Sequence, residues 1–361
     1  MKILFHLGHP AHFHLFKNVI HDLESENHTI FIVIKKKDIL EDLLINANMK
    51  YVNILPDGRK DSKMQIAVGQ FKQNTKLYKF CKKVKPDLLV GTSVAISHVG
   101  KLLKIPSINF NEDDFDVVPL YGKLAYPWAT FIVAPKCCSV GKWFSKKVSY
   151  NGYHELAYLH PNRFIPNKEV VEKYFNADET YFVIRLAKLN AHHDFGISGI
   201  STELAKKIIQ ILEKKGKIYI TSERKLEPEF EKYRIAINPL DMHHVLSFSA
   251  LFLGDSQTMS AEAGVLGVPF IRINDFVGKI SYLNELENDY KLGFGFLPSQ
   301  EKEILKTLCD TLSNVDTNSI FQQRRAKMLE DKIDVTAFLV WLFENYPQSV
   351  ADYQLHQKWP L

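Results

Sequence analysis

The sequence predicts an α/β protein of two Rossmann-like, doubly wound domains, each built around a parallel sheet. Segments with strand and helix periodicity alternate along the chain. Around residues 151–167 this pattern weakens and prolines appear, after which a second alternation starts. A chain of 361 residues is also too long for one ordinary core. We therefore expect one domain over residues 1–160, a second over 161–334, and a C-terminal helix and tail over 335–361.

The first domain opens with a strand over residues 2–7, a turn over 8–12 and a helix over 12–26. The helix is predicted because its apolar residues recur at helical spacing. The other elements expected in this domain are strands over 29–34, 51–55, 86–91, 106–110 and 131–134, and helices over 38–47, up to 84, and over 94–103.

The second domain repeats the alternation. Its expected strands cover 181–185, 217–221, 235–237, 250–253 and 269–273, and its expected helices cover 202–214, a segment from 242, 301–313 and 320–331. A final helix is expected over 335–345. Ligands of open parallel sheets bind beyond the carboxyl ends of the strands. Two such domains therefore predict a ligand site in a cleft that they both face.

The composition is typical of a globular enzyme, with 46% hydrophobic and 24% charged residues. The formal net charge is +5 and the pI is about 8.7. Because the excess lysines are spread over helices, as at 82–85, we interpret them as a solvated surface. Peripheral contact with an anionic membrane or substrate is the alternative, and we expect no nucleic-acid partner.

The cysteines and the apolar segments bear on the compartment. The four cysteines form no CxxC pair, which favours a reduced, cytoplasmic compartment. Residues 1–6 are predicted to form a strand rather than a signal peptide, because the apolar run is short and His6 interrupts it. No segment approaches the roughly 18 apolar residues of a membrane span, so we expect no transmembrane segment.

Residues 253–269 carry the strongest ligand-binding pattern. An apolar strand ends in a glycine, and Asp255 or Ser256 can cap the helix that follows. The N-terminus of such a helix binds phosphate through its N–H groups and its partial positive charge. Glu262 lies four residues after Thr258 on the same helix face, where a carboxylate can reach two ribose hydroxyls. Capped helices follow strands in any α/β protein, but a carboxylate among small, packed residues indicates a partner.

Several segments carry a resemblance to a known family. They are Gly8-His9-Pro10-Ala11-His12-Phe13, Asn151-Gly152-Tyr153-His154-Glu155-Leu156-Ala157-Tyr158-Leu159, Asn190-Ala191-His192-His193-Asp194, Gly254-Asp255-Ser256-Gln257-Thr258-Met259 and Asn274-Asp275-Phe276-Val277-Gly278. Through them the chain resembles, over almost all of residues 1–346, a prokaryotic family called domain of unknown function 354. That family is related to GT-B glycosyltransferases and UDP-N-acetylglucosamine 2-epimerases.

The resemblance implies a GT-B fold: two Rossmann-like, doubly wound parallel-sheet domains that face each other across a cleft. It implies a nucleotide-sugar, most simply a UDP-sugar, bound there as a substrate, without a further cofactor. It also implies that the C-terminal helix, expected within 335–361, packs back on the first domain.

The epimerases help to assign roles to the motif of the second domain. Their corresponding motif is Asp-Ser-Gly-Gly-Ile-Gln-Glu-Glu-Ala. The resemblance implies that Ser256 contacts phosphate and that Glu262 holds the ribose hydroxyls. Gln257 and Thr258 replace the double glycine, so we expect the phosphate to sit differently here.

The first domain departs from the epimerases. Their His-Val-Glu-Ala-Gly segment, whose Glu is catalytic, corresponds to residues 109–113, without His or Glu in register. Their Gly-Asp-Thr turn corresponds to 91–93, which lacks the acid. Proton removal at a sugar carbon needs a general base. The departure therefore disfavours an epimerase, unless Glu112, Asp113 or Asp114 substitutes after a shift.

The turn after the first strand is instead similar to the His-bearing turn of MurG-like glycosyltransferases. In those enzymes it lies beneath the donor diphosphate and the acceptor, which implies ligand contact at Gly8. Because imidazole titrates near neutral pH, His9 or His12 is a candidate base for an acceptor hydroxyl. Alternatively these histidines only donate hydrogen bonds to phosphate or sugar, or are structural.

Further candidates lie after other strands of the second domain. Arg185 occupies a position where GT-B proteins place a cation against the diphosphate, a task that suits a guanidinium. Ser222 and Glu223 are predicted to contact the base or the ribose. His243 is predicted to contact the base, and Asp275 the sugar hydroxyls. A surface or core role is the alternative for Arg185 and His243.

We expect no metal site, because the adjacent His192 and His193 cannot easily share one ion. The leading hypothesis is a GT-B glycosyltransferase of surface-polysaccharide or glycoconjugate synthesis. Its predicted partners are a nucleotide-sugar donor and a sugar or lipid-linked acceptor. A UDP-sugar 2-epimerase or hydrolase is the first alternative. A protein that binds nucleotide-sugars without catalysis is the second.

Overall fold

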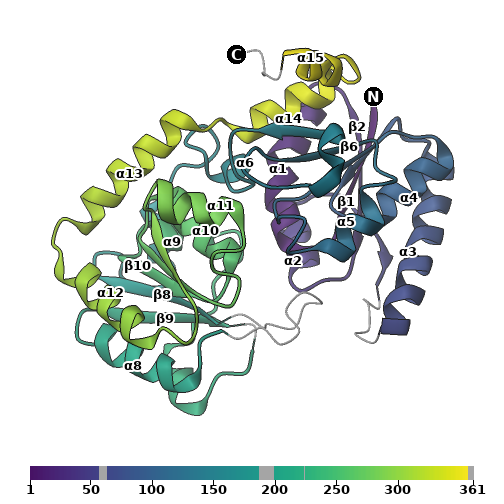
Figure 1. The fold of residues 1–361 in the computed structure, drawn as a ribbon. Helices are drawn as coiled ribbons and strands as arrows, with labels where there is room; N and C mark the ends of the chain where they lie inside the picture. Colours follow the sequence, from purple (N-terminus) through teal and green to yellow (C-terminus); the bar gives the residue numbers. More distant parts are fainter. Residues whose placement is uncertain (57–62, 187–198, 223, 357–361) are drawn as a thin grey trace. The chain divides into compact units, whose positions relative to one another are not determined.

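The computed structural model describes residues 1–56, 63–186, 199–222 and 224–356, and Figure 1 shows its fold. Within these residues, every helix falls short of the length and apolarity that a membrane span requires. The chain divides into two compact units. Unit 1 comprises Met1–Tyr158 and Ile333–Leu361, and unit 2 comprises Leu159–Lys332.

Unit 1 contains a seven-stranded parallel sheet in the order β3-β2-β1-β4-β5-β6-β7. The strands are β1 (Lys2–Leu7), β2 (Thr29–Lys35), β3 (Val52–Leu55), β4 (Leu88–Gly91), β5 (Ser107–Phe110), β6 (Phe131–Pro135) and β7 (Lys147–Tyr150). The helices are α1 (Pro10–Ser25), α2 (Leu40–Asn46), α3 (Lys63–Val84), α4 (Val94–Leu103), α5 (Pro119–Ala125), the 3₁₀-helix η1 (Gly141–Lys146), α6 (Leu156–Leu159), α14 (Val335–Glu344) and α15 (Gln348–His356).

Helices cover both faces of this sheet, as alternation along β1 shows. Leu4 belongs to a buried cluster with Leu77 of α3 and Val99 of α4. The next residue, Phe5, packs its ring 5.2 Å from Phe16 of α1 and 5.9 Å from Phe343 of α14. Because successive strand side chains point to opposite faces, α3 and α4 lie on one face and α1 and α14 on the other (Figure 1).

Unit 2 contains a five-stranded parallel sheet in the order β12-β11-β10-β8-β9. The strands are β8 (Tyr181–Leu186), β9 (Lys217–Ser222), β10 (Leu251–Gly254), β11 (Phe270–Ile273) and β12 (Gly293–Phe296). The helices are α7 (Lys168–Glu172), α8 (Thr202–Leu212), the 3₁₀-helix η2 (Pro228–Tyr233), α9 (Met242–Ser247), α10 (Gln257–Leu266), α11 (Ser281–Asn284), the π-helix η3 (Glu285–Asp289), α12 (Glu301–Ser313) and α13 (Thr317–Asp331).

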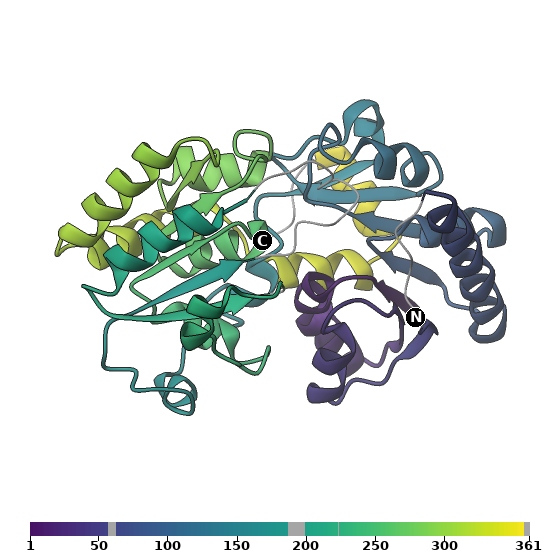
Figure 2. The same cartoon turned by 90° about the horizontal axis from the view of Figure 1, so that it is seen from below.

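The faces of this second sheet are also covered separately (Figures 1 and 2). Ile184 and Ile271 join a buried cluster with Leu204 of α8 and Ile304 of α12. On the other face, the Tyr181 hydroxyl donates to the carbonyl of Val245 in α9, and α9 packs on α10.

One predicted strand is wrong. Residues 235–237 form no strand; Arg234 makes a single bridge with Ile220, whose carbonyl also accepts the N–H of Ile235. Only one pair of residues is aligned here, because the preceding η2 holds residues 228–233 in a helical turn.

Candidate functional site

Each sheet reverses its strand order at one place. In unit 1, β2 and β3 extend from one side of β1 and β4 to β7 from the other, so the reversal lies between β1 and β4. In unit 2 the reversal lies between β8 and β10. Open parallel sheets bind ligands at such points, beyond the carboxyl ends of the strands. The turns that follow β1, β4, β8 and β10 are therefore the candidate positions.

In unit 2 the turn after β10 presents the N-terminus of α10. Gly254 ends the strand so close to its neighbour that a Cβ there would lie 2.8 Å from the carbonyl oxygen of Arg185. Ser256 is the N-cap of α10, and its Oγ accepts the N–H of Met259 at 3.4 Å. The first N–H groups of an α-helix have no intrahelical acceptor, so those of Gln257 and Thr258 form an anion-binding end.

Glu262 and His243 form a buried pair behind this helix end. Each residue is 4% exposed, and Glu262 Oε1 lies 2.9 Å from His243 Nε2. The two residues come from α10 and α9, whose packing brings them together. Sequence analysis predicted both as ligand contacts but not their contact with each other. The imidazole therefore holds the carboxylate in one position.

A second buried network holds the turn after β11, where Asp275 lies half-buried. Arg272 makes a bidentate ion pair with Glu287, with N–O distances of 2.8 and 3.1 Å, and is fully buried. Its Nη1 also donates to Asn274 Oδ1 at 3.3 Å. Asn274 Nδ2 donates to the carbonyl of Asp255 at 3.0 Å, which ties this turn to the turn after β10.

The remaining predicted residues of unit 2 are placed as follows. Arg185 is half-buried at the carboxyl end of β8, next to the Gly254 turn. Ser222 Oγ lies 2.8 Å from the carbonyl oxygen of Arg224 and accepts the N–H of Arg224 at 3.1 Å, so its hydroxyl closes the turn after β9. Glu223, and the segment 187–198 with His192 and His193, lie outside the described residues.

In unit 1 His12 joins the two turns at the strand reversal. His12 Nδ1 accepts the N–H of Gly8, after β1, at 3.1 Å. Thr92 Oγ1, after β4, lies 2.6 Å from Nδ1 and 2.9 Å from Nε2 of the same ring. His9 is the exposed N-cap of α1, and its Nδ1 accepts the N–H of Ala11 at 3.2 Å. Gly8, His9 and His12 thus meet at one carboxyl edge.

Electrostatics keep His12 neutral. Burial lowers its pKa well below the ordinary 6.5, and the neighbouring His9, His154, Lys35 and His6 lower it further. At neutral pH the ring therefore carries one proton, and it can accept a hydrogen bond or a proton.

A histidine and a glutamate also lie next to each other at this edge. Sequence analysis did not predict that they would be neighbours. His154, after β7, places Nδ1 3.1 Å from Oε2 of Glu112, after β5. Burial lowers the His154 pKa to about 4, against the opposing effect of Glu155 and Asp113. At neutral pH the ring is therefore neutral and lies beside Glu112 without a hydrogen bond to its Oε2, and Nε2 is buried without a hydrogen-bond partner among the described residues.

Sequence analysis offered separate reasons to consider His154 and Glu112, but no reason to pair them. His154 lies within the family-like segment 151–159, and Glu112 was a candidate substitute for the epimerase acid. Their 42-residue separation gives no local pattern, since only the neighbouring positions of β5, β6 and β7 in the sheet bring them together.

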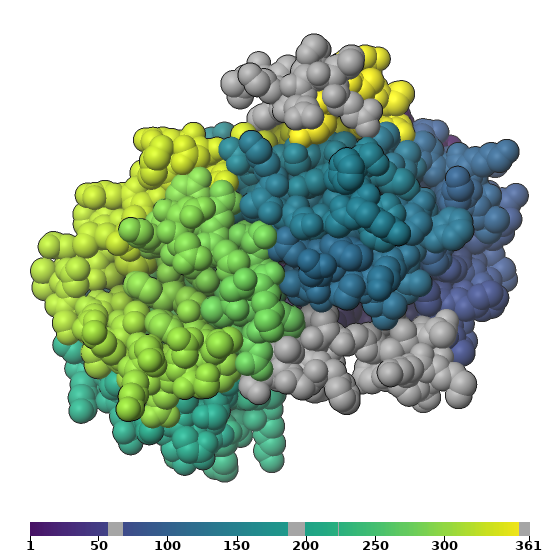
Figure 3. Space-filling view, viewed as in Figure 1, coloured from purple at the N-terminus to yellow at the C-terminus, as the bar shows by residue number. Residues whose placement is uncertain are grey.

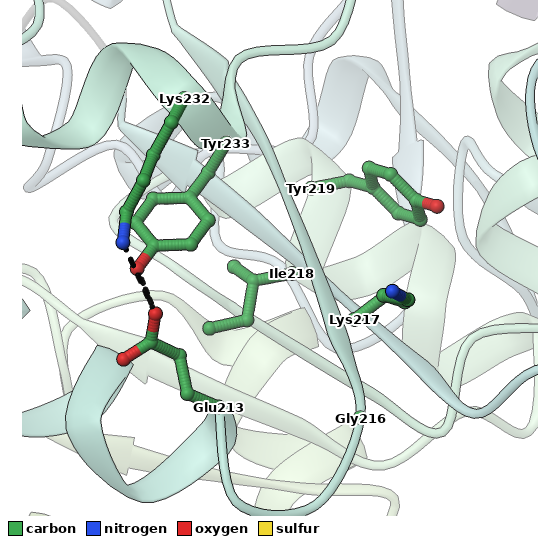
Figure 4. Close-up of a pocket in the computed structure, with 7 residues that line it drawn as sticks. All are labelled: Glu213, Gly216, Lys217, Ile218, Tyr219, Lys232 and Tyr233. Atoms are coloured by element: carbon green, nitrogen blue, oxygen red, sulfur yellow. Dashed lines mark hydrogen bonds and ion pairs between the residues drawn. The ribbon is translucent and has the colours of Figure 1, made fainter.

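A surface hollow of unit 2 lies elsewhere (Figure 4). It is lined by Glu213, Gly216, Lys217, Ile218, Tyr219, Lys232 and Tyr233. Lys217 begins β9, so the hollow lies at the amino edge of the sheet, opposite the Ser256 turn. It is therefore not the candidate site. Within the described ranges, no three His, Cys, Asp or Glu side chains gather as a metal-ligand set.

The sequence matches one family model, described as "Protein of unknown function (DUF354)", over residues 1–294. No curated protein matches it. Similar solved structures include a UDP-GlcNAc 2-epimerase of Neisseria meningitidis bound to UDP-GlcNAc, with a TM-score of 0.66 at 17% identity, over 96% of this chain and 100% of that chain. The UDP-GlcNAc 2-epimerase of Methanocaldococcus jannaschii, in complex with UDP-GlcNAc and UDP, gives 0.66 at 17% identity, over 87% and 93%.

A glycosyltransferase is also similar, to a somewhat lower degree. Spinosyn rhamnosyltransferase SpnG, complexed with spinosyn aglycone, gives a TM-score of 0.61 at 12% identity, over 96% of this chain and 100% of that chain. At such identities these likenesses show the fold alone. They confirm the predicted GT-B architecture of two parallel-sheet units.

Proposed function

Because the chain belongs to the DUF354 family and has the GT-B fold, we propose that it is a nucleotide-sugar-dependent glycosyltransferase. We assign it to surface-polysaccharide or glycoconjugate synthesis, with a UDP-sugar as donor. The observation that carries the proposal is the pair of polar clusters at the two strand reversals, one suited to a nucleotide diphosphate and the other to proton transfer.

Unit 2 binds the donor in this proposal. The N-terminus of α10, capped by Ser256, and the Arg185 guanidinium hold the diphosphate. Glu262, fixed by His243, accepts hydrogen bonds from the ribose hydroxyls. Asp275 contacts the sugar from a turn that the Arg272 network holds in place.

Unit 1 binds the acceptor and supplies the base. The acceptor hydroxyl loses its proton to the imidazole of His154, which lies beside Glu112, as its oxygen bonds to the anomeric carbon of the donor sugar. The bond from that carbon to the diphosphate breaks, and the electron pair leaves with the diphosphate. Arg185 and the α10 N-terminus offset the charge that develops there. His12 holds the Gly8 turn next to the Thr92 turn.

The test is incubation with UDP-, GDP-, CMP- and TDP-sugars, with and without candidate acceptors. Release of the nucleotide that depends on an acceptor is the expected result. Glu262→Ala should weaken UDP binding about tenfold to a hundredfold, since a hydrogen bond to a charged group contributes about 1.5–3 kcal/mol. Unchanged UDP affinity by calorimetry would remove Glu262 from the ribose site. Binding without turnover of any donor would leave a binding protein.

A second candidate, a UDP-sugar 2-epimerase or hydrolase, is favoured by one observation. Glu112 gives the edge after β5 a carboxylate, although no acid is in register with the epimerase motif. An epimerase would incorporate solvent deuterium at C2 of the donor sugar without any acceptor, and a hydrolase would release free sugar. Either result would replace the transferase proposal.

A further inference from the structure

The net positive charge of the chain is concentrated in one layer of unit 1. We define the basic layer as α3, α4, α5 and η1. These elements contain ten lysines and no Asp or Glu. The whole chain has a formal net charge of +5, so the rest of the chain is negative by five charges. The basicity is therefore a property of this layer and not of the surface as a whole.

Three lysines of this layer have no carboxylate partner within the part of the chain that the structure describes. Among the described residues, no carboxylate lies within ion-pairing distance of Lys72, Lys101 or Lys123, all of which are exposed. In unit 2, by contrast, Lys206 and Lys207 lie 3.0 and 2.5 Å from carboxylates. The positive potential of the layer is consequently not neutralised by the protein itself.

Large apolar side chains are exposed among these lysines. Five of them are exposed by 43% to 72%: Phe71 of α3, Leu102 of α4, Leu120 and Leu124 of α5, and Trp128 just beyond it. Single exposed apolar residues are ordinary, so the arrangement decides whether they form a patch.

The helices of the layer place these side chains around His98 of α4. His98 Nδ1 lies 3.1 Å from Asn74 of α3, its Nε2 lies 2.9 Å from the carbonyl oxygen of Leu124, and its ring packs on Trp128 at 6.0 Å. Phe71 precedes Asn74 by three residues, and Leu102 follows His98 by four. Positions three or four apart share a helix face, so the exposed apolar residues form one patch. Part of this layer is the blue surface of unit 1 in Figure 3.

We propose that the basic layer docks on a membrane surface rich in anionic lipid. Unpaired lysines supply attraction to the headgroups, and the apolar side chains between them enter the boundary between headgroups and acyl chains. A nucleic-acid partner would use the lysines but would leave the aliphatic Leu102, Leu120 and Leu124 in water. The combination of both kinds of side chain favours lipid. The proposal does not depend on the enzymatic reaction, since it concerns helices that lack the candidate site residues.

The experiment is flotation of the full chain with vesicles of phosphatidylcholine alone or mixed with phosphatidylglycerol, at low and high salt. Binding is expected only to the mixed vesicles and should weaken with salt. The triple variant Lys72→Glu, Lys101→Glu, Lys123→Glu should bind at least about a hundredfold more weakly, given roughly fivefold for each lysine near the surface. The matched control is Lys214→Glu, Lys302→Glu, Lys306→Glu, which makes the same charge change on exposed positions of unit 2 and should bind as the wild type does.

A second variant tests the apolar component. Phe71→Ser with Leu120→Ser replaces only exposed side chains, so the far-ultraviolet circular dichroism should not change, whereas binding to the mixed vesicles should fall about tenfold or more. Equal loss in the control triple, or no binding to mixed vesicles, would overturn the proposal. Binding to duplex DNA through the same lysines, without vesicle binding, would overturn it in favour of nucleic acid.

Discussion

The two strand reversals occupy the same place in their sheets but contain different polar chemistry. Beside β10, the polar groups are an ion pair and a carboxylate with buried partners, namely Arg272 with Glu287 and Glu262 with His243. Beside β1, the groups are imidazoles held neutral by burial, His12 and, at the same edge, His154. Topology thus fixes where each cluster lies. The cluster beside β10 is built on buried ion pairs, and the cluster beside β1 is built on neutral imidazoles.

The largest effect is expected from removing the proposed base. His154→Gln should lower turnover by about 10²- to 10⁴-fold, the usual contribution of a general base, with UDP affinity unchanged because the donor is assigned to unit 2. Glu112→Gln should lower turnover less, since the ring remains and only the neighbouring carboxylate is lost. If His154→Gln turned over as fast as the wild type, His154 would not be the general base and His12 would become the candidate. His12→Gln in the same assay would then test His12.

The ionic network of unit 2 is expected to be the most costly to break in terms of stability. Arg272→Met leaves Glu287 buried and without its charge partner, which should reduce the free energy of unfolding by about 3–5 kcal/mol. Urea unfolding followed by fluorescence would measure this loss. The double variant Arg272→Met, Glu287→Leu should recover a large part of it, because no buried charge is left alone. Equal losses in the single and double variants would contradict the assigned pairing.

Acid should act on unit 1 through its neutral histidines. Burial lowers the pKa of His154 to about 4 and that of His6 to about 3, both below the ordinary 6.5. At pH values between the folded pKa of each ring and 6.5, the unfolded chain binds more protons than the folded chain. The stabilisation is therefore complete above pH 6.5 and is lost as the pH falls towards the folded pKa values.

For His154 alone the loss should approach roughly 3 kcal/mol once the pH is below its folded pKa. Thermal unfolding between pH 7 and pH 4 would measure it. His154→Gln should flatten the pH dependence by a corresponding amount, and an unchanged slope would show that the ring is not buried in its neutral form.

The smallest effect concerns the helix end of unit 2. Ser256→Ala removes the cap of α10 and should cost about 1 kcal/mol of stability. Ser256→Thr keeps an oxygen acceptor and is the matched control. UDP affinity, measured by calorimetry, should fall in the alanine variant. Full affinity in that variant would show that Ser256 does not contribute to phosphate binding.

Sequence periodicity predicted most of the described strands and helices, because burial on one or two faces leaves a pattern in the chain. It missed β7 and β12. The four residues of β7 include a lysine, and β12 contains Gly293 and Gly295, so neither has a continuous apolar run.

The candidate site was predicted one side chain at a time. A linear pattern shows which residues follow or precede a strand, and this led to Ser256, Glu262, His243 and His12. The same pattern does not show which of these side chains contact one another. The Glu112–His154 and Arg272–Glu287 pairs join different turns, and such pairings depend on the order of strands in the sheet.

The last described helix has a consequence for association between chains. β7 is an edge strand of the unit 1 sheet, and edge strands carry unpaired backbone groups to which another strand can add. The hydroxyl of Tyr353, in α15, accepts the N–H of Ser149 in β7 at 3.2 Å and lies 2.7 Å from its Oγ. The helix thereby occupies the Ser149 N–H, a donor that a strand of a second chain would need. This contact disfavours extension of the sheet and aggregation at this edge.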